Sequence, residues 1–235
     1  MKITVMIAAK NEELMLPGCL KSVEFADEVI VIDDYSNDNT RQIAKKFGAK
    51  VFKRRLDGFA TQKNFGITKS SNDWVLIVDA DERVEDSLIK EISAIKSNSK
   101  YSAYDIPRKN FIKGKWLKHG GLYPDYQRRL INKNHCKYGT REVHEIMDVN
   151  GSTARLRGNI IHYTYSTYKE YYTKVKKYAV LEAQWTTNRP RFVSIPKAFV
   201  VRYFVEKGYK DGISGFVSAV LMSYYQLLIW KKVGK

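Results

Sequence analysis

Short apolar runs alternate with helical patterns through the first 80 residues of the chain. The runs are rich in β-branched residues and occupy positions 3–8, 28–32, 50–52 and 74–78. The segments between them predict helices over about 12–25, 39–47 and 61–68. Strands separated by crossover helices form βαβ units, so the pattern predicts a largely parallel sheet flanked by helices. In such sheets, ligands bind at the carboxyl ends of the strands.

The regular alternation ends near residue 100. Beyond it, glycine, tyrosine and basic residues are frequent, which indicates mixed strands and functional loops, and helical patterns return close to residue 167. We therefore expect a catalytic domain over 1–165, made of a nucleotide-binding part (1–100) and an acceptor part (101–165), and a C-terminal helical extension over 166–235.

The excess positive charge is confined to the second part of the chain. The 235 residues include 41 Lys+Arg and 25 Asp+Glu, a formal net charge of +16. Residues 1–100 hold 16 of each kind, so residues 101–235 carry 25 basic and 9 acidic residues. This asymmetry indicates an anionic partner, which can be nucleic acid, a membrane surface or an acidic substrate.

Cysteine usage and the N-terminus bear on the compartment. Cys19 and Cys136 have no metal-type spacing and are too few for a disulfide framework, which favours a reducing compartment. The first apolar run is too short for the core of a signal peptide and is interpreted as a strand. We therefore expect a cytoplasmic protein.

Acidic residues follow the second predicted strand. Asp33 and Asp34 come directly after it, with Ser36 and Asp38 close behind. A carboxylate at this edge can accept the N3–H of uracil, but Asp and Ser also cap helices and close turns. Both interpretations stay open for Asp33, Ser36 and Asp38.

The fourth predicted strand runs directly into Asp79-Ala80-Asp81-Glu82. Residues i and i+2 of an extended chain point to the same side, so Asp79 and Asp81 are expected to face the crevice together. Such hard oxygen ligands suit Mg²⁺ or Mn²⁺ bridging a diphosphate. The first strand lacks the glycine-rich fingerprint of a dinucleotide site and ends near Asn11, which is expected to cap the next helix.

The strand-end motifs resemble those of family 2 glycosyltransferases of the GT-A fold, in the same order and at similar spacing: Asn11-Glu12, Val31-Ile32-Asp33-Asp34 and Asp79-Ala80-Asp81-Glu82. Later segments resemble a subgroup that elongates the lipopolysaccharide core, often with β-linked glucose; they lie at 123–130, 143–145, 158–163 and 208–212. The resemblance implies a GT-A (Rossmann-like) domain that transfers a sugar, most simply glucose, from a UDP-sugar with inversion.

The resemblance also implies roles for individual residues. Asp34 would bind uracil, and Asp81 and the late His162 would hold Mg²⁺ or Mn²⁺. The other expected donor-site residues are Asn11, Glu12, Lys63, Asp79 and Arg129. Arg129 is expected to face the leaving diphosphate from a mobile loop.

An inverting transferase needs a carboxylate that takes the proton from the acceptor hydroxyl. The resemblance assigns this role to Glu145, with Glu142 as the fallback. His144 is expected to orient Glu145 or the acceptor. A salt bridge to a nearby cation is the structural alternative for Glu145.

The tail holds a run of 18 uncharged residues, 213–230, followed by Lys231 and Lys232. Its length is borderline for a membrane span, and its serines, tyrosines and glutamine lower its hydrophobicity. We expect a helix that lies in the membrane interface or packs on the domain. Together with the basic charge, this predicts a peripheral protein at the cytoplasmic membrane surface that acts on an anionic lipid-linked acceptor.

Two alternatives remain at this point. Within the family, the acceptor can be a polyprenyl phosphate, whose nucleophile is already ionised and needs no strong base. In a different class, basic residues interleaved with aromatic ones are typical of single-strand nucleic-acid binding. That interpretation leaves Asp34, Asp79 and Asp81 without a role, so we expect no nucleic-acid partner.

Overall fold

The structure is a computed structural model that describes residues 1–139, 147–186, 188 and 190–233. The chain forms two compact units. The first unit comprises Met1–Arg108 and Tyr126–His162, and the second comprises Lys109–Asp125 and Tyr163–Lys235. The expected boundary at residue 165 lies close to the break after His162, but the segment Lys109–Asp125 groups with the C-terminal extension.

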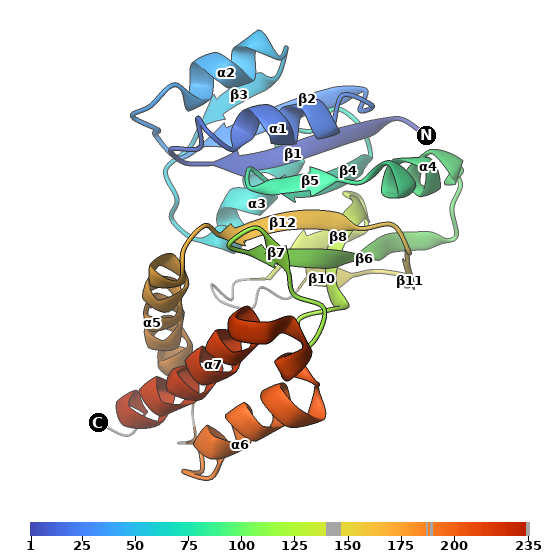
Figure 1. Cartoon of the computed structure of the whole chain (residues 1–235). Coiled ribbons are helices and arrows are strands. Elements are labelled where there is room, and N and C mark those ends of the chain that lie inside the picture. Colours follow the sequence, from blue (N-terminus) through green and yellow to red (C-terminus); the bar gives the residue numbers. More distant parts are fainter. Residues whose placement is uncertain (140–146, 187, 189, 234–235) are drawn as a thin grey trace. The chain divides into compact units, whose positions relative to one another are not determined.

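Four parallel strands form the core of the first unit: β1 (Ile3–Ala9), β2 (Glu28–Asp33), β3 (Lys50–Lys53) and β4 (Trp74–Asp79). They lie in the order β3-β2-β1-β4, and every neighbouring pair is parallel (Figure 1). The central strands β1 and β4 are apolar on both faces because helices cover both sides of the sheet. The four predicted strands are confirmed.

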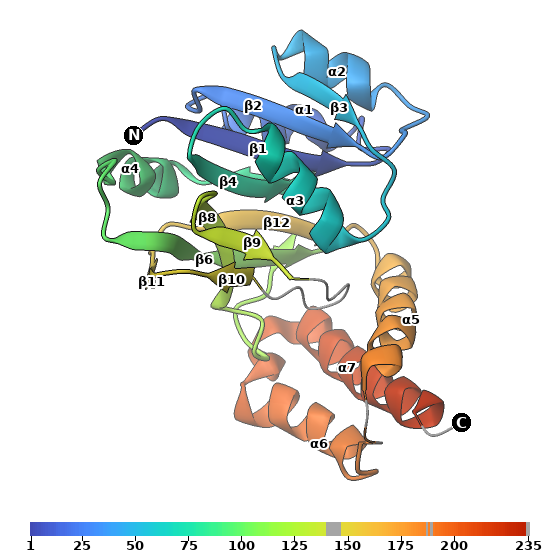
Figure 2. The same cartoon turned by 180° about the vertical axis from the view of Figure 1, so that it is seen from behind.

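Alternate residues of β1 contribute to two different hydrophobic clusters. Val5 and Ile7 pack with apolar residues of α1 (Leu16–Ser22), α2 (Thr40–Lys46) and α4 (Asp86–Ala94). Met6 instead packs with Ala60 and Ile67 of α3 (Phe59–Lys69). Helix α1 accordingly lies on the face seen in Figure 1 and α3 on the face seen in Figure 2.

The helix predicted over 12–25 is shorter than expected. Helix α1 begins at Leu16, with Met15 in the capping position and Pro17 in the first turn, where proline is tolerated. Asn11 therefore does not cap it, and the expectation was wrong. Asn11 has a left-handed backbone (φ 54°), a conformation that asparagine tolerates better than most residues.

The sheet continues beyond β4 in the order β4-β8-β6-β12-β5. The pairs β4·β8 and β12·β5 are antiparallel, so the described sheet is mixed although its first half is parallel. The added strands are β5 (Glu82–Val84), β6 (Tyr101–Ile112), β8 (Asp125–Asn132) and β12 (Ile160–Tyr165). Short strands β7 (Lys115–Trp116) and β11 (Ser152–Arg155) pair with β6, and β9 (Cys136–Tyr138) pairs with β10 (Met147–Val149).

The C-terminal extension is helical, as predicted. Its elements are α5 (Tyr168–Trp185), α6 (Ser194–Val200), the π-helical turn η1 (Val201–Val205), the 3₁₀ turn η2 (Gly208–Asp211) and α7 (Gly212–Lys232). Thr167 caps α5 by accepting a hydrogen bond from the Glu170 backbone N–H. Tyr171 and Val175 of α5 pack with Leu221 of α7 in a separate small core.

Candidate active site

The carboxyl ends of β1, β2 and β4 meet at one edge of the parallel sheet. Ala9 of β1 lies opposite Asp33 of β2, and Ala8 lies opposite Asp79 of β4. The acidic ends of β2 and β4 are thus two strands apart, about 10 Å at the usual strand spacing. Acidic residues distant in sequence therefore share one edge, where βαβ folds bind their ligands.

The loops after β1 and β2 are tied together by their own polar side chains. The Asn11 backbone N–H donates to Ser36 Oγ at 2.9 Å, and Asn11 Oδ1 accepts from the Asn37 N–H at 2.9 Å. The Glu12 N–H donates to Thr40 Oγ1 at 2.8 Å. Asn11 and Ser36 thus shape the edge of the site, and Glu12 is placed there through its backbone.

Asp33 and Asp34 are both buried but have different partners. Asp33 accepts from the Ser36 N–H, which fixes the turn after β2. Asp34 accepts from Lys10 Nζ at 2.7 Å and from the Leu56 N–H at 3.0 Å. Burial alone raises the pKa of the Asp34 carboxyl, but these hydrogen bonds outweigh it and hold that pKa below its usual value. Asp34 is therefore an ionised acceptor at neutral pH.

A buried ion-pair network lies at the end of β4. Arg129 Nη2 donates to Asp79 Oδ2 and to Glu82 Oε1, both at 2.8 Å, and Arg108 Nη1 lies 3.4 Å from the same Glu82 oxygen. The other Glu82 oxygen accepts from the Asp79 N–H at 2.9 Å. Burial opposes ionisation of Asp79, but the guanidinium of Arg129 and the ammonium of Lys63 keep its pKa well below the usual range.

Glu82 and Arg108 were given no role by the sequence motifs. Glu82 is fully buried, and its carboxylate connects Asp79 with both arginines. The available signal was its position at the end of the acidic motif, three residues after Asp79. Arg108 carried no such signal, because it reaches the network from a strand remote in sequence.

Two expectations about this region were wrong. Arg129 lies within strand β8 and is buried, so it does not belong to a mobile loop. Ala80 and Asp81 form a turn between β4 and β5, so Asp79 and Asp81 are not neighbours on one face of an extended strand. The turn separates their partners: Asp79 pairs with Arg129, whereas Asp81 Oδ2 lies 3.3 Å from His162 Nε2.

Asp81 and His162 are brought together by the antiparallel pairing of β12 with β5. His162 lies opposite Glu82 in that pairing, which puts its buried ring beside the Asp81 turn. The described residues contain no group of three or more His, Cys, Asp or Glu side chains arranged to hold a metal ion. A metal ion would thus have two ligands from this pair and would take the rest from a diphosphate and water, as Mg²⁺ and Mn²⁺ sites do.

Lys63 and its neighbour Asn64 face strand β9. Lys63 Nζ lies 5.2 Å from the centre of the Tyr138 ring, and Asn64 exchanges two 2.9 Å hydrogen bonds with the Tyr138 backbone. Lys63 also contributes positive charge at Asp79. The expected base Glu145, its fallback Glu142 and His144 lie outside the described residues.

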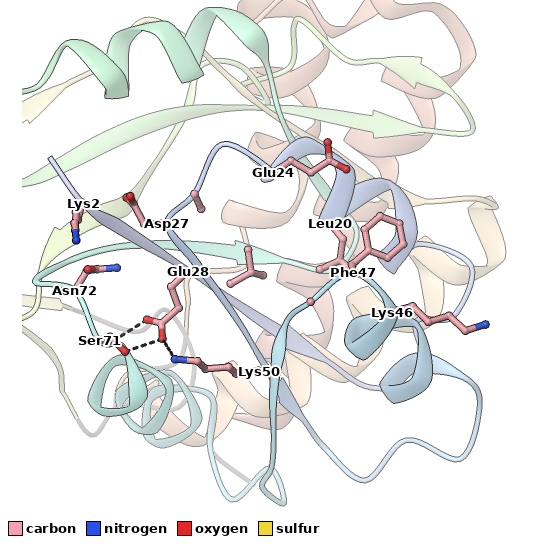
Figure 3. A pocket seen from close by; sticks show the side chains of 13 residues that line it. Lys2, Leu20, Glu24, Asp27, Glu28, Lys46, Phe47, Lys50, Ser71 and Asn72 are labelled. Atoms are coloured by element: carbon pink, nitrogen blue, oxygen red, sulfur yellow. Dashed lines mark hydrogen bonds and ion pairs between the residues drawn. The ribbon is translucent and has the colours of Figure 1, made fainter.

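A hollow of about 630 Å³ lies at the opposite ends of the parallel strands, near the starts of β2 and β3 (Figure 3). Glu28 on its wall accepts from Lys50 Nζ and from the N–H and hydroxyl of Ser71, each at 2.7 Å, and from Thr4 Oγ1. Burial tends to raise the pKa of Glu28, but these bonds outweigh it and lower that pKa to about 2. Because its carboxylate is already saturated, we assign this wall to structure.

The chain is similar to glycosyltransferases over most of its length. It is 25% identical to the lipopolysaccharide core biosynthesis glycosyltransferase LpsC of Rhizobium meliloti, over 98% of this chain and 91% of that protein. It is 28% identical to an uncharacterized glycosyltransferase of Rickettsia typhi, over 97% of this chain and 85% of that one.

The fold is similar to that of solved glycosyltransferases. The crystal structure of Staphylococcus aureus TarS 1-349 matches with a TM-score of 0.51 over 91% of this chain and 73% of that chain, at 16% identity. The mixed sheet with flanking helices is the GT-A fold expected from the strand-end motifs. The sequence model described as "Glycosyl transferase family 2" matches residues 4–162, so the chain belongs to glycosyl transferase family 2.

Proposed function

We propose that this enzyme transfers a sugar from a UDP-sugar to a lipid-linked saccharide such as lipopolysaccharide core, with inversion at the anomeric carbon. Glucose is the sugar that we favour. The similarity to LpsC favours that acceptor class. The proposal is carried by one edge of the sheet, where the ionised Asp34 at the end of β2 and the Asp79–Arg129 pair at the end of β4 lie on either side of β1. This edge offers an acceptor for a base and a cation for a diphosphate.

The donor nucleoside is assigned to the β1 and β2 ends. Asp34 accepts the uracil N3–H, since a carboxylate has free lone pairs even when it already accepts two hydrogen bonds. Its partner Lys10 has a side chain that is 60% exposed and is free to move aside. Asn11 and Glu12 lie at the same edge of the sheet, in the loop that Ser36 holds. Lys63 contributes charge on the side of Asp79.

The leaving diphosphate is assigned to Arg129. Its Nη2 is engaged by Asp79 and Glu82, whereas its Nη1 is buried without a hydrogen-bond partner among the described residues. A buried, unsatisfied donor of a charged group is costly, by about 1 to 3 kcal/mol or more. A phosphate oxygen would satisfy it with a charge-assisted hydrogen bond. Arg129 would thus stabilise the negative charge that develops on the departing UDP.

The pair Asp81 and His162 fits a divalent cation. A carboxylate oxygen and an imidazole nitrogen form a donor set that Mn²⁺ accepts readily, and Mg²⁺ accepts the carboxylate. Such an ion would neutralise charge on the diphosphate oxygens when bound. The low exposure of His162 keeps its ring fixed beside Asp81.

The transfer itself is a single displacement. The acceptor hydroxyl oxygen forms a bond to the anomeric carbon as the bond from that carbon to the diphosphate oxygen breaks, and the electron pair leaves with UDP. Glu145 takes the hydroxyl proton, with Glu142 as the alternative base, and His144 orients the acceptor.

A donor and acceptor screen tests the proposal. UDP release from UDP-glucose, UDP-galactose and a GDP-sugar control is measured with Mn²⁺, first as slow hydrolysis and then with lipid A-core extracts. We expect UDP-glucose to be favoured and lipid A-core to accelerate release. Acceleration by a polyprenyl phosphate in place of lipid A-core would assign the alternative acceptor. A preference for the GDP-sugar would contradict the assignment of Asp34.

A further inference from the structure

The N-terminal part of helix α7 turns two serines toward the protein and exposes apolar side chains, although the inward side of the helix also holds Ala219 and Leu221. Ser214 and Ser218 are buried, at 6% and 3% exposure, whereas Ile213 and Phe216 are 75% and 47% exposed. A helix on the surface of a water-soluble domain has the reverse arrangement. The outward face of α7 is therefore suited to an apolar environment.

The inward serines are engaged by tyrosines of α5. Tyr168 Oη lies 2.9 Å from Ser214 Oγ, and Tyr171 Oη lies 3.0 Å from Ser218 Oγ. Burial raises the pKa of the Tyr171 hydroxyl, so it stays protonated and able to donate. These bonds fix the rotation of α7 about its own axis, and with it the direction of the apolar face.

Aromatic contacts join apolar residues of α6, η1, η2 and α7. Phe199 and Tyr203 of the preceding segment pack edge to face on Phe216 of α7, with ring centres 5.9 and 5.6 Å apart. Phe204 packs on both Phe199 and Tyr203, and Tyr209 packs on Tyr203. We call this surface the apolar face; its exposed members are Val200, Phe204, Val205, Tyr209, Ile213, Phe216 and Val220.

Basic residues accompany the apolar face. The second unit contains 17 Lys+Arg and 5 Asp+Glu, a net charge of +12 out of the +16 of the chain. Lys197, Lys207 and Lys210 are exposed and alternate in sequence with members of the apolar face. Of the two acidic residues in this segment, Asp211 is buried and accepts from the His119 N–H, whereas Glu206 is exposed. An apolar area accompanied by cations complements an anionic lipid surface, where headgroups lie above acyl chains.

We propose that the apolar face of α6, η1 and α7 docks the enzyme on an anionic membrane, with α7 lying in the plane of the interface. The helical segment Gly208–Lys232 is long enough and apolar enough to cross a membrane, although core helices of soluble proteins also meet these two criteria. Spanning would require α7 to lose its hydrogen bonds to Tyr168 and Tyr171, whereas docking preserves them. The sequence left open whether this helix packs on the protein or inserts in the membrane. In the docked arrangement, one face of α7 packs on the protein and the opposite face contacts the membrane.

Sedimentation of the full chain with vesicles tests the docking surface. The vesicles are phosphatidylcholine with or without phosphatidylglycerol, and the variants are Phe204→Asn/Ile213→Asn and, as control, Phe47→Asn/Leu14→Asn. The control replaces an aromatic and an aliphatic residue of similar exposure in the first unit. We expect the first variant to lose about tenfold or more of its partition onto anionic vesicles and the control to retain it. Circular dichroism confirms that both variants fold.

A second pair of variants separates charge from insertion. Lys207→Gln/Lys210→Gln should weaken vesicle binding at low salt and leave the binding that persists at high salt unchanged. The control Lys45→Gln/Lys46→Gln removes two exposed lysines of the first unit and should leave binding unchanged at both salt concentrations. Equal binding of the Phe204/Ile213 variant and the unmodified chain would overturn the proposal. The proposal would also be overturned if the unmodified chain formed a dimer without lipid and the Phe204/Ile213 variant did not, because the apolar face would then bind a second copy of the chain. Neither experiment uses donor or acceptor, so failure here is distinct from failure of the proposed reaction.

Discussion

Arg129 on β8 lies 2.8 Å from Asp79, the last residue of β4, and joins two neighbouring antiparallel strands through an ion pair whose arginine is buried. The same nitrogen of Arg129 reaches the fully buried Glu82. The acidic end of the parallel sheet is thus held by a cation from the antiparallel half. Structure and proposed chemistry depend on the same side chain.

Removing this cation should destabilise the protein strongly. Arg129→Met leaves Glu82 buried with the hydrogen bond from the Asp79 N–H and the longer ion pair to Arg108, and breaking a buried pair in this way costs about 3 to 5 kcal/mol. The control is Arg128→Met, because Arg128 pairs with Asp105 at a half-exposed site where such a pair contributes about 1 kcal/mol or less. Urea unfolding measures both. Equal losses of unfolding free energy in the two variants would contradict the network.

The carboxylate of Glu28 should make stability depend on pH. Its pKa is lowered in the folded state from 4.5 to about 2, so its contribution is complete above the unfolded value and is lost as the pH falls through the folded one. Glu28→Gln should therefore be less stable than the unmodified chain at pH 7, by about 1 to 2 kcal/mol after screening of the exposed Lys50. The difference in unfolding free energy between the two proteins should disappear as the pH falls from 4.5 to 2. Glu24→Gln, an exposed neighbour, should show no such difference in a series of melts.

The parallel half of the fold was predictable because its signals are local. Strands β1, β2 and β4 contain long apolar runs and β3 a short one, and the stop of α2 is marked by Gly48, whose φ of 78° suits glycine. The antiparallel half depends on pairings between distant segments, such as β4 with β8, which hydrophobic periodicity does not encode. The same limit applies to α7, whose composition predicted a helix but not which face would turn inward.

The site was predictable as a set of strand ends but not as a set of partners. Asp34 and Asp81 follow their strands and Asp79 is the last residue of β4, so all three lie at strand ends as the motifs indicated. The turn at Ala80 and the pairing of β12 with β5 decide that Asp81 meets His162, and both are set by tertiary structure. Glu82 stood out in the sequence only as the end of an acidic motif, because its burial and its arginine partners are set by tertiary structure.

The two aspartates of the motif should differ in what they control. Asp81→Asn removes a proposed metal ligand at a partly exposed turn, so it should weaken UDP binding in Mn²⁺ with little change in melting temperature. Asp79→Asn also weakens the ion pair with Arg129 and should lower the melting temperature as well. Calorimetry and thermal melts of both variants separate the effects. A stable Asp79→Asn together with an unstable Asp81→Asn would reverse the assignment.

His162 should contribute to metal affinity. His162→Ala is expected to weaken Mn²⁺ binding about tenfold or more in the presence of UDP, measured by the electron paramagnetic resonance signal of free Mn²⁺. His119→Ala is the matched control, because His119 pairs with Asp211 in the second unit. Unchanged Mn²⁺ affinity in a folded His162→Ala would leave His162 with a structural role only.

The proposed base should affect transfer more than donor binding. Glu145→Gln keeps the shape of the side chain and removes the proton acceptor, so transfer should fall about 10² to 10⁴-fold with UDP affinity nearly unchanged. Glu142→Gln is measured in parallel. Normal transfer by Glu145→Gln with loss in Glu142→Gln would move the role to Glu142.

Titration of UDP into the full chain, with Mn²⁺ and again with EDTA, tests directly whether the acidic strand ends form a metal-assisted UDP-sugar site. We predict measurable binding in Mn²⁺, its loss in EDTA, and weaker binding of CDP because cytosine lacks the N3–H that Asp34 accepts. Equal affinity for UDP in Mn²⁺ and in EDTA, or no binding of UDP in either, would contradict the account.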